Sequence, residues 1–416
     1  MSKSNIYKIF ISLTLIFSFT LTSFSYHKEV KVNSKDKFLL GNEVLLEKSS
    51  YLIKDKRIGL ITNLSGVLSD GTLFLDALVK NFSITKIFTP EHGLRVDDTD
   101  ENYIDEVTGI SVVSLYGQNK KPSGNYLSNV DVMVYDIQDV GARFYTFINT
   151  MYYCMETAIE NDKEIIICDR PVIINSNYVD GFILNPSVSS FVGLLNIPIA
   201  YGMTCGELAN YINSENFDNK CKLTVVKMEN YNHSKDYSSL NLPWIKPSPN
   251  MYYPSSAICY PGTCLFEGTN FAEGRGTDRP FEYIGAPYCN GVALAKEMSA
   301  YNFLGVNFES ISFTPHAIIS PSNPPKYTDQ LCEGVYVNVN DIKTFEPVKV
   351  GIALLVSLKK LFPQFEINKN NFLDNLAGTK DFRIMLNEGK SYEDIINSYS
   401  KSLEDFKAKR EKYLLY

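Results

Sequence analysis

Acidic, basic, amide and phenol side chains follow several short apolar segments in the first half of the chain, where they could act together on a ligand. They are Asn63, Glu91 with His92, Tyr116, Asp136 with Asp139, and Asp169 with Arg170. Carboxyl and imidazole groups are common general acids and bases in enzymes. Each residue alone has a simpler explanation, since a strand must end in something polar. Five such positions in succession indicate a site.

The apolar segments predict strands, and the amphipathic stretches between them predict helices. Strands are expected at 57–63, 84–88, 110–115, 131–136 and 164–168. One helix is expected at 71–80, and a long helix is expected after the strand at 131–136 and its loop, ending at about residue 160. Apolar strands that alternate with helices are typical of a parallel sheet covered on both faces. Ligands bind such sheets at the carboxyl ends of the strands, where the polar residues lie. No glycine-rich nucleotide motif follows these strands.

The second half of the chain has a different pattern. Pro and Gly cluster between residues 243 and 287, which predicts a long ordered loop system, and such loops are usually functional. Strands are expected at 308–315 and 334–339, a helix at 349–362, and a final pair of helices at 391–416. We therefore expect two domains, at residues 26–200 and 201–416.

The first 25 residues have the layout of a secretory signal peptide. Lys3 and Lys8 precede an apolar run from Ile9 to Phe24, and a small-x-small cleavage site stands before Tyr26. The run is short for a membrane-spanning helix, and an uncleaved membrane anchor is the alternative. We expect secretion to the medium, cell wall or periplasm.

Composition and charge argue against several function classes. A net charge of −7 without a long basic block argues against a nucleic acid partner, and the Lys120–Lys121 and Lys359–Lys360 pairs are expected on the solvated surface. Eight Cys without a C-x-x-C pair, and only four His, predict mostly free thiols and argue against a structural zinc site. We expect no metal and no cofactor. The 27 Tyr suit a sugar-binding cleft, although composition drift explains most of them equally well.

Longer motifs are distributed along the chain from residue 88 to residue 416, and the resemblance that they carry covers nearly all of the mature chain. They are Phe-Thr-Pro-Glu-His-Gly (88–93), Tyr-Asp-Ile-Gln-Asp-Val-Gly-Ala-Arg-Phe-Tyr-Thr (135–146), Gly-Met-Thr-Cys-Gly-Glu-Leu-Ala (202–209), Pro-Ser-Pro-Asn-Met (247–251), Tyr-Pro-Gly-Thr-Cys-Leu-Phe-Glu-Gly-Thr-Asn (260–270), Gly-Arg-Gly-Thr-Asp-Arg-Pro-Phe-Glu (274–282) and Tyr-Leu-Leu-Tyr (413–416). In this order they resemble the NamZ-type exo-β-N-acetylmuramidases, glycoside hydrolase family 171.

The resemblance implies an α/β fold: a Rossmann-like parallel-sheet N-terminal domain, a smaller α+β C-terminal domain and an active-site cleft between them. It also implies removal, without a metal, of non-reducing terminal N-acetylmuramic acid (MurNAc) from its β-1,4 bond to N-acetylglucosamine (GlcNAc). The substrate would be a disaccharide or muropeptide derived from peptidoglycan. The catalytic residue that the resemblance implies is Glu91.

Three loops depart from the family's motifs. Residues 93–96 lead into an acidic stretch at 97–101, Val172 and Ile173 stand where the family has asparagine and proline, and Tyr201 replaces a histidine. We expect these loops to border the cleft and to bear on substrate preference.

Glycoside hydrolysis needs an acid for the leaving oxygen and a second group at the anomeric carbon. Glu91, in a turn after a buried strand, is the candidate acid, with His92 to orient it; a Glu that caps the next segment is the alternative. The second group could be the 2-acetamido oxygen of MurNAc, oriented by Asp136 or Asp139, although Asp139 also suits a helix N-cap. The other candidates, from the second domain, are Glu267 and Glu282.

The lactyl carboxylate of MurNAc requires local positive charge on a protein of net negative charge. An Arg fork binds a carboxylate with two hydrogen bonds, and Arg143 or Arg275 is favoured over Arg170. A structural salt bridge is the alternative for each of them. The candidates for binding sugar hydroxyls are Asn63, Tyr116, Tyr145 and Asn270.

Other functions stay open beside this one. A Ser or Cys hydrolase is disfavoured, because the chain has no G-x-S-x-G motif and Cys205 has no evident His partner. A wall-binding protein without catalysis, or an exo-glycosidase for another amino sugar such as GlcNAc, would also fit the altered loops.

Overall fold

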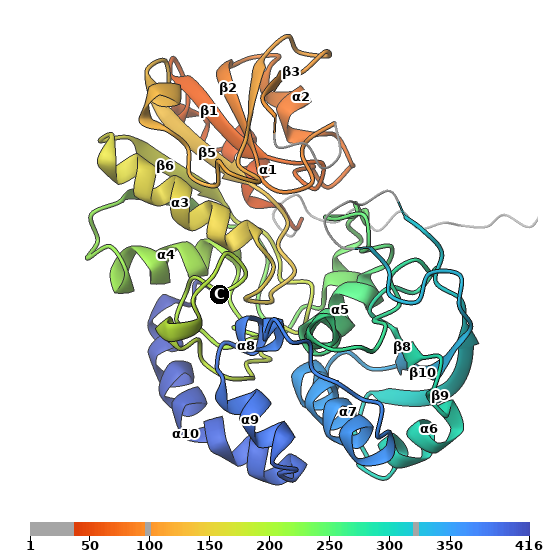
Figure 1. Ribbon diagram of the computed structural model, residues 1–416. Helices are drawn as coiled ribbons and strands as arrows, with labels where there is room; N and C mark the ends of the chain where they lie inside the picture. Colours follow the sequence, from red (N-terminus) through yellow and green to blue (C-terminus); the bar gives the residue numbers. More distant parts are fainter. Residues whose placement is uncertain (1–36, 96–100, 319–323) are drawn as a thin grey trace, which may run out of the picture. The chain divides into compact units, whose positions relative to one another are not determined.

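A seven-stranded sheet organises the first part of the chain (Figure 1). A computed structural model describes residues 37–95, 101–318 and 324–416. The strands are β1 (Arg57–Thr62), β2 (Ser83–Thr89), β3 (Tyr103–Ile104), β4 (Ser111–Ser114), β5 (Val132–Asp136), β6 (Glu164–Cys168) and β7 (Lys222–Val226). Their spatial order is β3-β4-β2-β1-β5-β6-β7, with all pairs parallel except β3 with β4. Apart from β3, this is the order of a Rossmann-like sheet, as predicted.

Both faces of this sheet are buried, which explains the continuous apolar runs in the sequence. Alternate residues of β5 belong to different cores. Val132 and Val134 share a cluster with α1 (Gly41–Glu47) and α2 (Phe74–Leu78). Met133 and Tyr135 share another with α3 (Phe147–Glu160) and α4 (Cys205–Glu215). Strand β7 joins the sheet beyond residue 200, where the sequence placed the end of the first domain.

A smaller antiparallel sheet, in the order β8-β10-β9, lies in the second part of the chain. Its strands are β8 (Tyr283–Ala286), β9 (Val306–Phe313) and β10 (Cys332–Val339). The helices of this part are α5 (Pro254–Thr263), α6 (Gly291–Ser299), α7 (Pro347–Leu361), α8 (Phe372–Ala377), α9 (Asp381–Asn387) and α10 (Tyr392–Arg410).

Two expectations for this part were wrong. The predicted loop system at 243–287 contains α5, which begins at Pro254, a position where the missing N–H of proline costs a helix nothing. The chain end holds one helix, α10, and a short 3-10 turn at Glu411–Tyr413 instead of two helices.

The eight cysteines are all buried, and none of them forms a disulfide with another. Within the described ranges, no helix combines the length and the apolar character that crossing a bilayer requires. The predicted signal peptide and residues 97–100 of the acidic stretch lie outside the described residues.

Candidate active site

A cavity of about 430 Å³ lies where β2 and β4 end. This volume is within the range of small-ligand sites, roughly 300–1,000 Å³. Both parts of the chain line it: Glu91, His92, Tyr116, Gly117, Lys120, Phe144, Tyr145, Thr146, Phe147, Phe191 and Val192 from the first, and Ser248, Asn250, Met251, Tyr260, Arg275 and Phe281 from the second. Among these described lining residues Glu91 is the only acid.

A strained turn after β2 presents Glu91 to the cavity. The Gly93 amide donates a 3.2 Å hydrogen bond to the Pro90 carbonyl, and His92 and Gly93 both have left-handed backbone angles, with φ of 73° and 59°. This conformation is unfavourable for a residue other than glycine, and such strain clusters at functional sites. Glu91 is half-buried, and the Thr146 hydroxyl donates a 2.8 Å hydrogen bond to its Oε2. The turn and Thr146 together hold the carboxylate in place.

The Tyr145 hydroxyl is a buried polar group in the same cavity. It lies beside Ser248 but makes no hydrogen bond of ordinary geometry with the described residues. The Tyr145 ring packs edge-to-face on Phe147 and Tyr260, with centroids 4.7 and 5.6 Å away. Burial raises the pKa of Tyr145 well above its ordinary value, so the phenol stays protonated. A rigid, neutral hydroxyl of this kind suits the polar edge of a ligand.

Arg275 brings a guanidinium from the second part of the chain. Its Nη2 lies 2.5 Å from Glu267 Oε1 and its Nε 3.4 Å from Glu273 Oε1, and the group packs 5.0 Å from the Phe281 ring centre. Burial opposes this charge, but the two carboxylates outweigh burial and raise the pKa of Arg275. Arg275 therefore lines the cavity with its charge already balanced.

Lys120 also lines the cavity, so the prediction that it lies on the solvated surface was wrong. Its Nζ lies 4.4 Å from the centre of the Phe191 ring, which lines the cavity as well. The neighbouring Lys121 instead pairs with Glu156 and Glu160, at 2.7 Å each.

Comparison with known protein families shows to which family the chain belongs. The model of the N-terminal domain of exo-beta-N-acetylmuramidase NamZ matches residues 58–255, and the model of its C-terminal domain matches residues 258–416. The chain belongs to the NamZ family. The resemblance drawn from the motifs is thereby confirmed.

Individual relatives match over nearly their full length. The peptidoglycan beta-N-acetylmuramidase NamZ of Bacillus subtilis (strain 168) is 42% identical over 421 residues, which is 100% of both chains. A crystal structure of a DUF1343 family protein from Bacteroides fragilis NCTC 9343 matches with a TM-score of 0.84 and 33% identity, over 92% of this chain and 99% of that one. A second such protein from the same organism matches with a TM-score of 0.74 and 36% identity, over 91% and 99%.

The polar residues at the carboxyl ends of the central strands β1, β5 and β6 do not line the cavity. Between β1 and β5, where Rossmann-like sheets usually bind ligands, Arg170 donates two hydrogen bonds of 2.7 and 2.8 Å to Asp136, and Asn42 of α1 donates a third. Asn63 Oδ1 accepts from the amide and hydroxyl of Ser65. Asn63, Asp136 and Arg170 are thus buried structural groups, which corrects the roles predicted for them.

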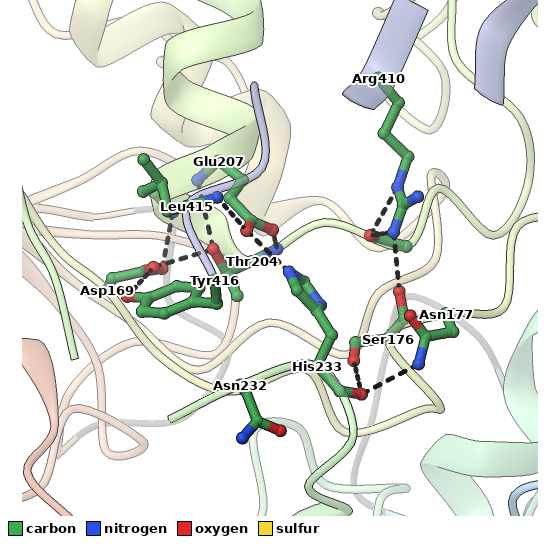
Figure 2. A network of polar contacts seen from close by, with 12 residues as sticks. Asp169, Ser176, Asn177, Thr204, Glu207, Asn232, His233, Arg410, Leu415 and Tyr416 are labelled. Atoms are coloured by element: carbon green, nitrogen blue, oxygen red, sulfur yellow. Dashed lines mark hydrogen bonds and ion pairs between the residues drawn. The ribbon is translucent and has the colours of Figure 1, made fainter. Parts of the chain in front are cut away.

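Asp169, the residue after β6, binds the C-terminal end of the chain instead of a ligand (Figure 2). Asp169 accepts hydrogen bonds from the Tyr416 hydroxyl at 2.7 Å, the Thr204 hydroxyl at 2.9 Å and the Gly206 amide at 2.8 Å. Glu207 accepts the Leu415 amide at 2.8 Å. The C-terminal Tyr-Leu-Leu-Tyr motif (413–416) therefore has a structural role, because it holds the chain end against Asp169 and Glu207.

Asp139 is buried outside the cavity, so neither a direct catalytic role nor an N-cap describes it. Its Oδ2 accepts the Gly141 amide and the Tyr201 hydroxyl. Tyr201, which we expected to border the cleft, is also buried in the core.

Arg143 was predicted to hold the substrate carboxylate, and the structure contradicts this. The side chain is fully buried and donates to the backbone carbonyls of Phe182, Ile197 and Leu376, at 2.7 to 2.8 Å. Burial lowers its pKa to about 9. Arg143 joins the first part of the chain to α8.

The remaining candidates from the second part also support structure. Glu282 accepts from the hydroxyls of Ser255 and Ser256, and Asn270 bonds to the backbone of Gln364 and Glu366. Glu267 lies outside the cavity lining, where it holds Arg275.

The structure thus brings together Glu91, His92, Tyr116, Tyr145 and Arg275 of the predicted site residues. Thr146, Ser248, Asn250 and Tyr260 also line the cavity and were not predicted to, although each lies within one of the family's motifs. Lys120 and Phe191 lie outside every such motif, and the lysine was expected on the solvated surface.

Proposed function

We propose that this protein is an exo-β-N-acetylmuramidase that hydrolyses the β-1,4 bond of non-reducing terminal MurNAc in peptidoglycan fragments. Both NamZ domain models match the chain, and a peptidoglycan muramidase of the family aligns with it over its full length. These matches support glycoside hydrolysis as the type of reaction. The observation that carries the proposal for the site is that Glu91 is the one carboxyl group among the described residues that line the cavity, beside aromatic, hydroxyl, amide, cationic and apolar groups.

Glu91 acts as the general acid in this proposal. Its carboxyl proton passes to the glycosidic oxygen as the bond to the anomeric carbon breaks, so that the leaving sugar departs with a neutral hydroxyl. The hydrogen bond from Thr146 to Oε2 fixes the carboxyl group, which leaves Oε1 for the substrate.

A second carboxylate is missing from the described lining, so the substrate supplies the other group. The carbonyl oxygen of the 2-acetamido group attacks the anomeric carbon and forms a cyclic intermediate. Water, deprotonated by the Glu91 carboxylate, then opens that ring and restores the acid. The Tyr145 oxygen is suited to accept the amide N–H, which keeps the carbonyl oxygen turned toward the anomeric carbon.

We also propose export through the N-terminal signal peptide, because peptidoglycan lies outside the cytoplasmic membrane. Residues 1–25 carry the charge, apolar run and cleavage site that export requires. Mass spectrometry of the secreted protein should find a mature N-terminus at Tyr26. An intact N-terminus in the membrane fraction would instead support the uncleaved anchor.

The test of the activity compares release of a chromophore from its β-MurNAc and β-GlcNAc glycosides by protein that begins at Tyr26. The wild type should act on the MurNAc glycoside, and Glu91→Gln should fold normally but lose at least a hundred-fold in kcat. Glu156→Gln, on α3 and outside the cavity, is the matched control and should keep its activity. A folded wild type that releases neither chromophore would support a glycan-binding relative without catalysis.

A further inference from the structure

Lys120 and Arg275 are the lysine and arginine side chains among the described residues that line the cavity, and of these two only Arg275 has its charge balanced. Arg275 faces the carboxylates of both Glu267 and Glu273. Lys326 also pairs with Glu273, at 2.7 Å, so the two cations and two carboxylates of this cluster balance one another, and the guanidinium offers a substrate anion little attraction. Bringing a second anion to this guanidinium would also repel the two glutamates.

Lys120 is the other cation, and it makes no ion pair or hydrogen bond with the residues that the structure describes. Its described partner is the face of the Phe191 ring, 4.4 Å from Nζ. A ring face attracts an ammonium group and positions it but accepts no ordinary hydrogen bond, so the N–H donors remain available. Lys120 is half-buried, which limits screening of its charge by solvent.

We propose that the Lys120 ammonium binds the lactyl carboxylate of MurNAc and so determines the preference of the enzyme for MurNAc over GlcNAc. The inference rests on the proposed function. GlcNAc has the same ring and acetamido group but no lactyl carboxylate, so a site that reads this carboxylate separates the two sugars. Phe191 holds the ammonium against the cavity wall, which reduces the entropy that a free lysine would lose on binding.

The experiment compares the wild type with Lys120→Met, Lys120→Arg and Lys121→Met on three chromogenic β-glycosides. These are the MurNAc glycoside, its lactyl amide, which lacks the charge, and the GlcNAc glycoside. Lys120→Met should lose about ten- to a hundred-fold in kcat/KM on the MurNAc glycoside, the usual worth of a hydrogen bond to a charged group. It should change less than two-fold on the amide and GlcNAc glycosides.

The two remaining variants control for charge and position. Lys120→Arg keeps the charge and should retain more activity than Lys120→Met. Lys121→Met removes the adjacent lysine, which pairs with Glu156 and Glu160 outside the cavity, and should match the wild type on all three substrates. Equal losses by Lys120→Met on the charged and amide substrates would overturn the proposal, because they would mean that Lys120 acts on folding or geometry.

Binding of free MurNAc and GlcNAc, measured by calorimetry, separates this inference from the proposed function. If the wild type hydrolyses no glycoside but binds MurNAc more tightly than GlcNAc, and Lys120→Met abolishes that difference, the proposed hydrolysis fails and the role of Lys120 stands. If the wild type hydrolyses the MurNAc glycoside and Lys120→Met keeps the full preference, the hydrolysis stands and Lys120 is not the determinant.

Discussion

Replacing Asp139 with asparagine should change how stability depends on pH while leaving hydrolysis within a few-fold of the wild type. Asp139 is buried outside the cavity, where Tyr201 and Gly141 donate hydrogen bonds to its Oδ2. Burial raises the pKa of Asp139 from an ordinary value of 3.8 to about 6, against the effect of those hydrogen bonds. The charged form is therefore disfavoured in the folded protein.

The size of the effect follows from the difference between the two pKa values. A difference of about 2, at about 1.4 kcal/mol per pKa unit, amounts to roughly 3 kcal/mol. Because the folded-state pKa is the higher one, this stability is fully present below about pH 4 and is lost as the pH rises through about 6. Asparagine cannot ionise, so Asp139→Asn should gain on the wild type by roughly 3 kcal/mol between pH 4 and pH 8.

Urea unfolding of both proteins at pH 2, 3, 4, 5, 6, 7 and 8 measures this difference. A constant offset is expected as well, because the asparagine amide replaces an acceptor with an N–H donor, but that offset does not vary with pH. Asp131→Asn is a control of opposite sign, because Arg57 holds the pKa of Asp131 below its ordinary value. The stability lost in that variant should shrink as the pH falls below about 4.

Either of two results would refute the reasoning. A difference between Asp139→Asn and the wild type that is the same at pH 4 and pH 8 would mean that burial does not disfavour the charge. A folded Asp139→Asn protein that has lost a hundred-fold or more in kcat would return Asp139 to the catalytic machinery, from which its place outside the cavity removes it.

Three further variants test the structural roles assigned here, each by urea unfolding. Arg143→Met should destabilise the protein by several kcal/mol, since three buried carbonyls lose a donor; a wild-type midpoint would contradict this. Arg170→Met should cost roughly 3–5 kcal/mol by leaving the Asp136 carboxylate buried and unpaired, and adding Asp136→Asn should recover part of the loss; additive costs would argue against the pair. Tyr416→Phe should cost about 1–3 kcal/mol, because the Met228 amide and Asp169 lose a partner, whereas Tyr51→Phe at an exposed position should cost nothing measurable.

The alternation of elements was predictable because it depends on local patterns. The β5 segment reads as a continuous apolar run, and the two cores of the sheet bury it from both sides. The α5 helix was not predictable in the same way, because Pro254, Pro261 and Gly262 resemble a loop until the packing of α5 on α7 is known.

The sequence by itself determined the sheet, the family and the turn that carries Glu91. A buried strand followed by Pro-Glu-His-Gly is local information, and so are motifs of eight or more residues. The choice among the five polar strand exits was not local. Asp136 and Glu91 both follow apolar strands, and only the tertiary structure shows that Arg170 and Asn42 surround the first and the cavity surrounds the second.

Local sequence was equally unable to show which cationic side chain could bind the substrate carboxylate. Arg143 and Lys120 differ in sequence mainly in that the arginine belongs to a motif and the lysine to a charged pair, which favoured the arginine as the ligand. The fold decided otherwise, because carbonyls from distant segments enclose Arg143, whereas Phe191 meets Lys120 at the edge of the cavity. A charge becomes a binding group only where its partners leave it unsatisfied, and those partners are brought together by residues far apart in the chain.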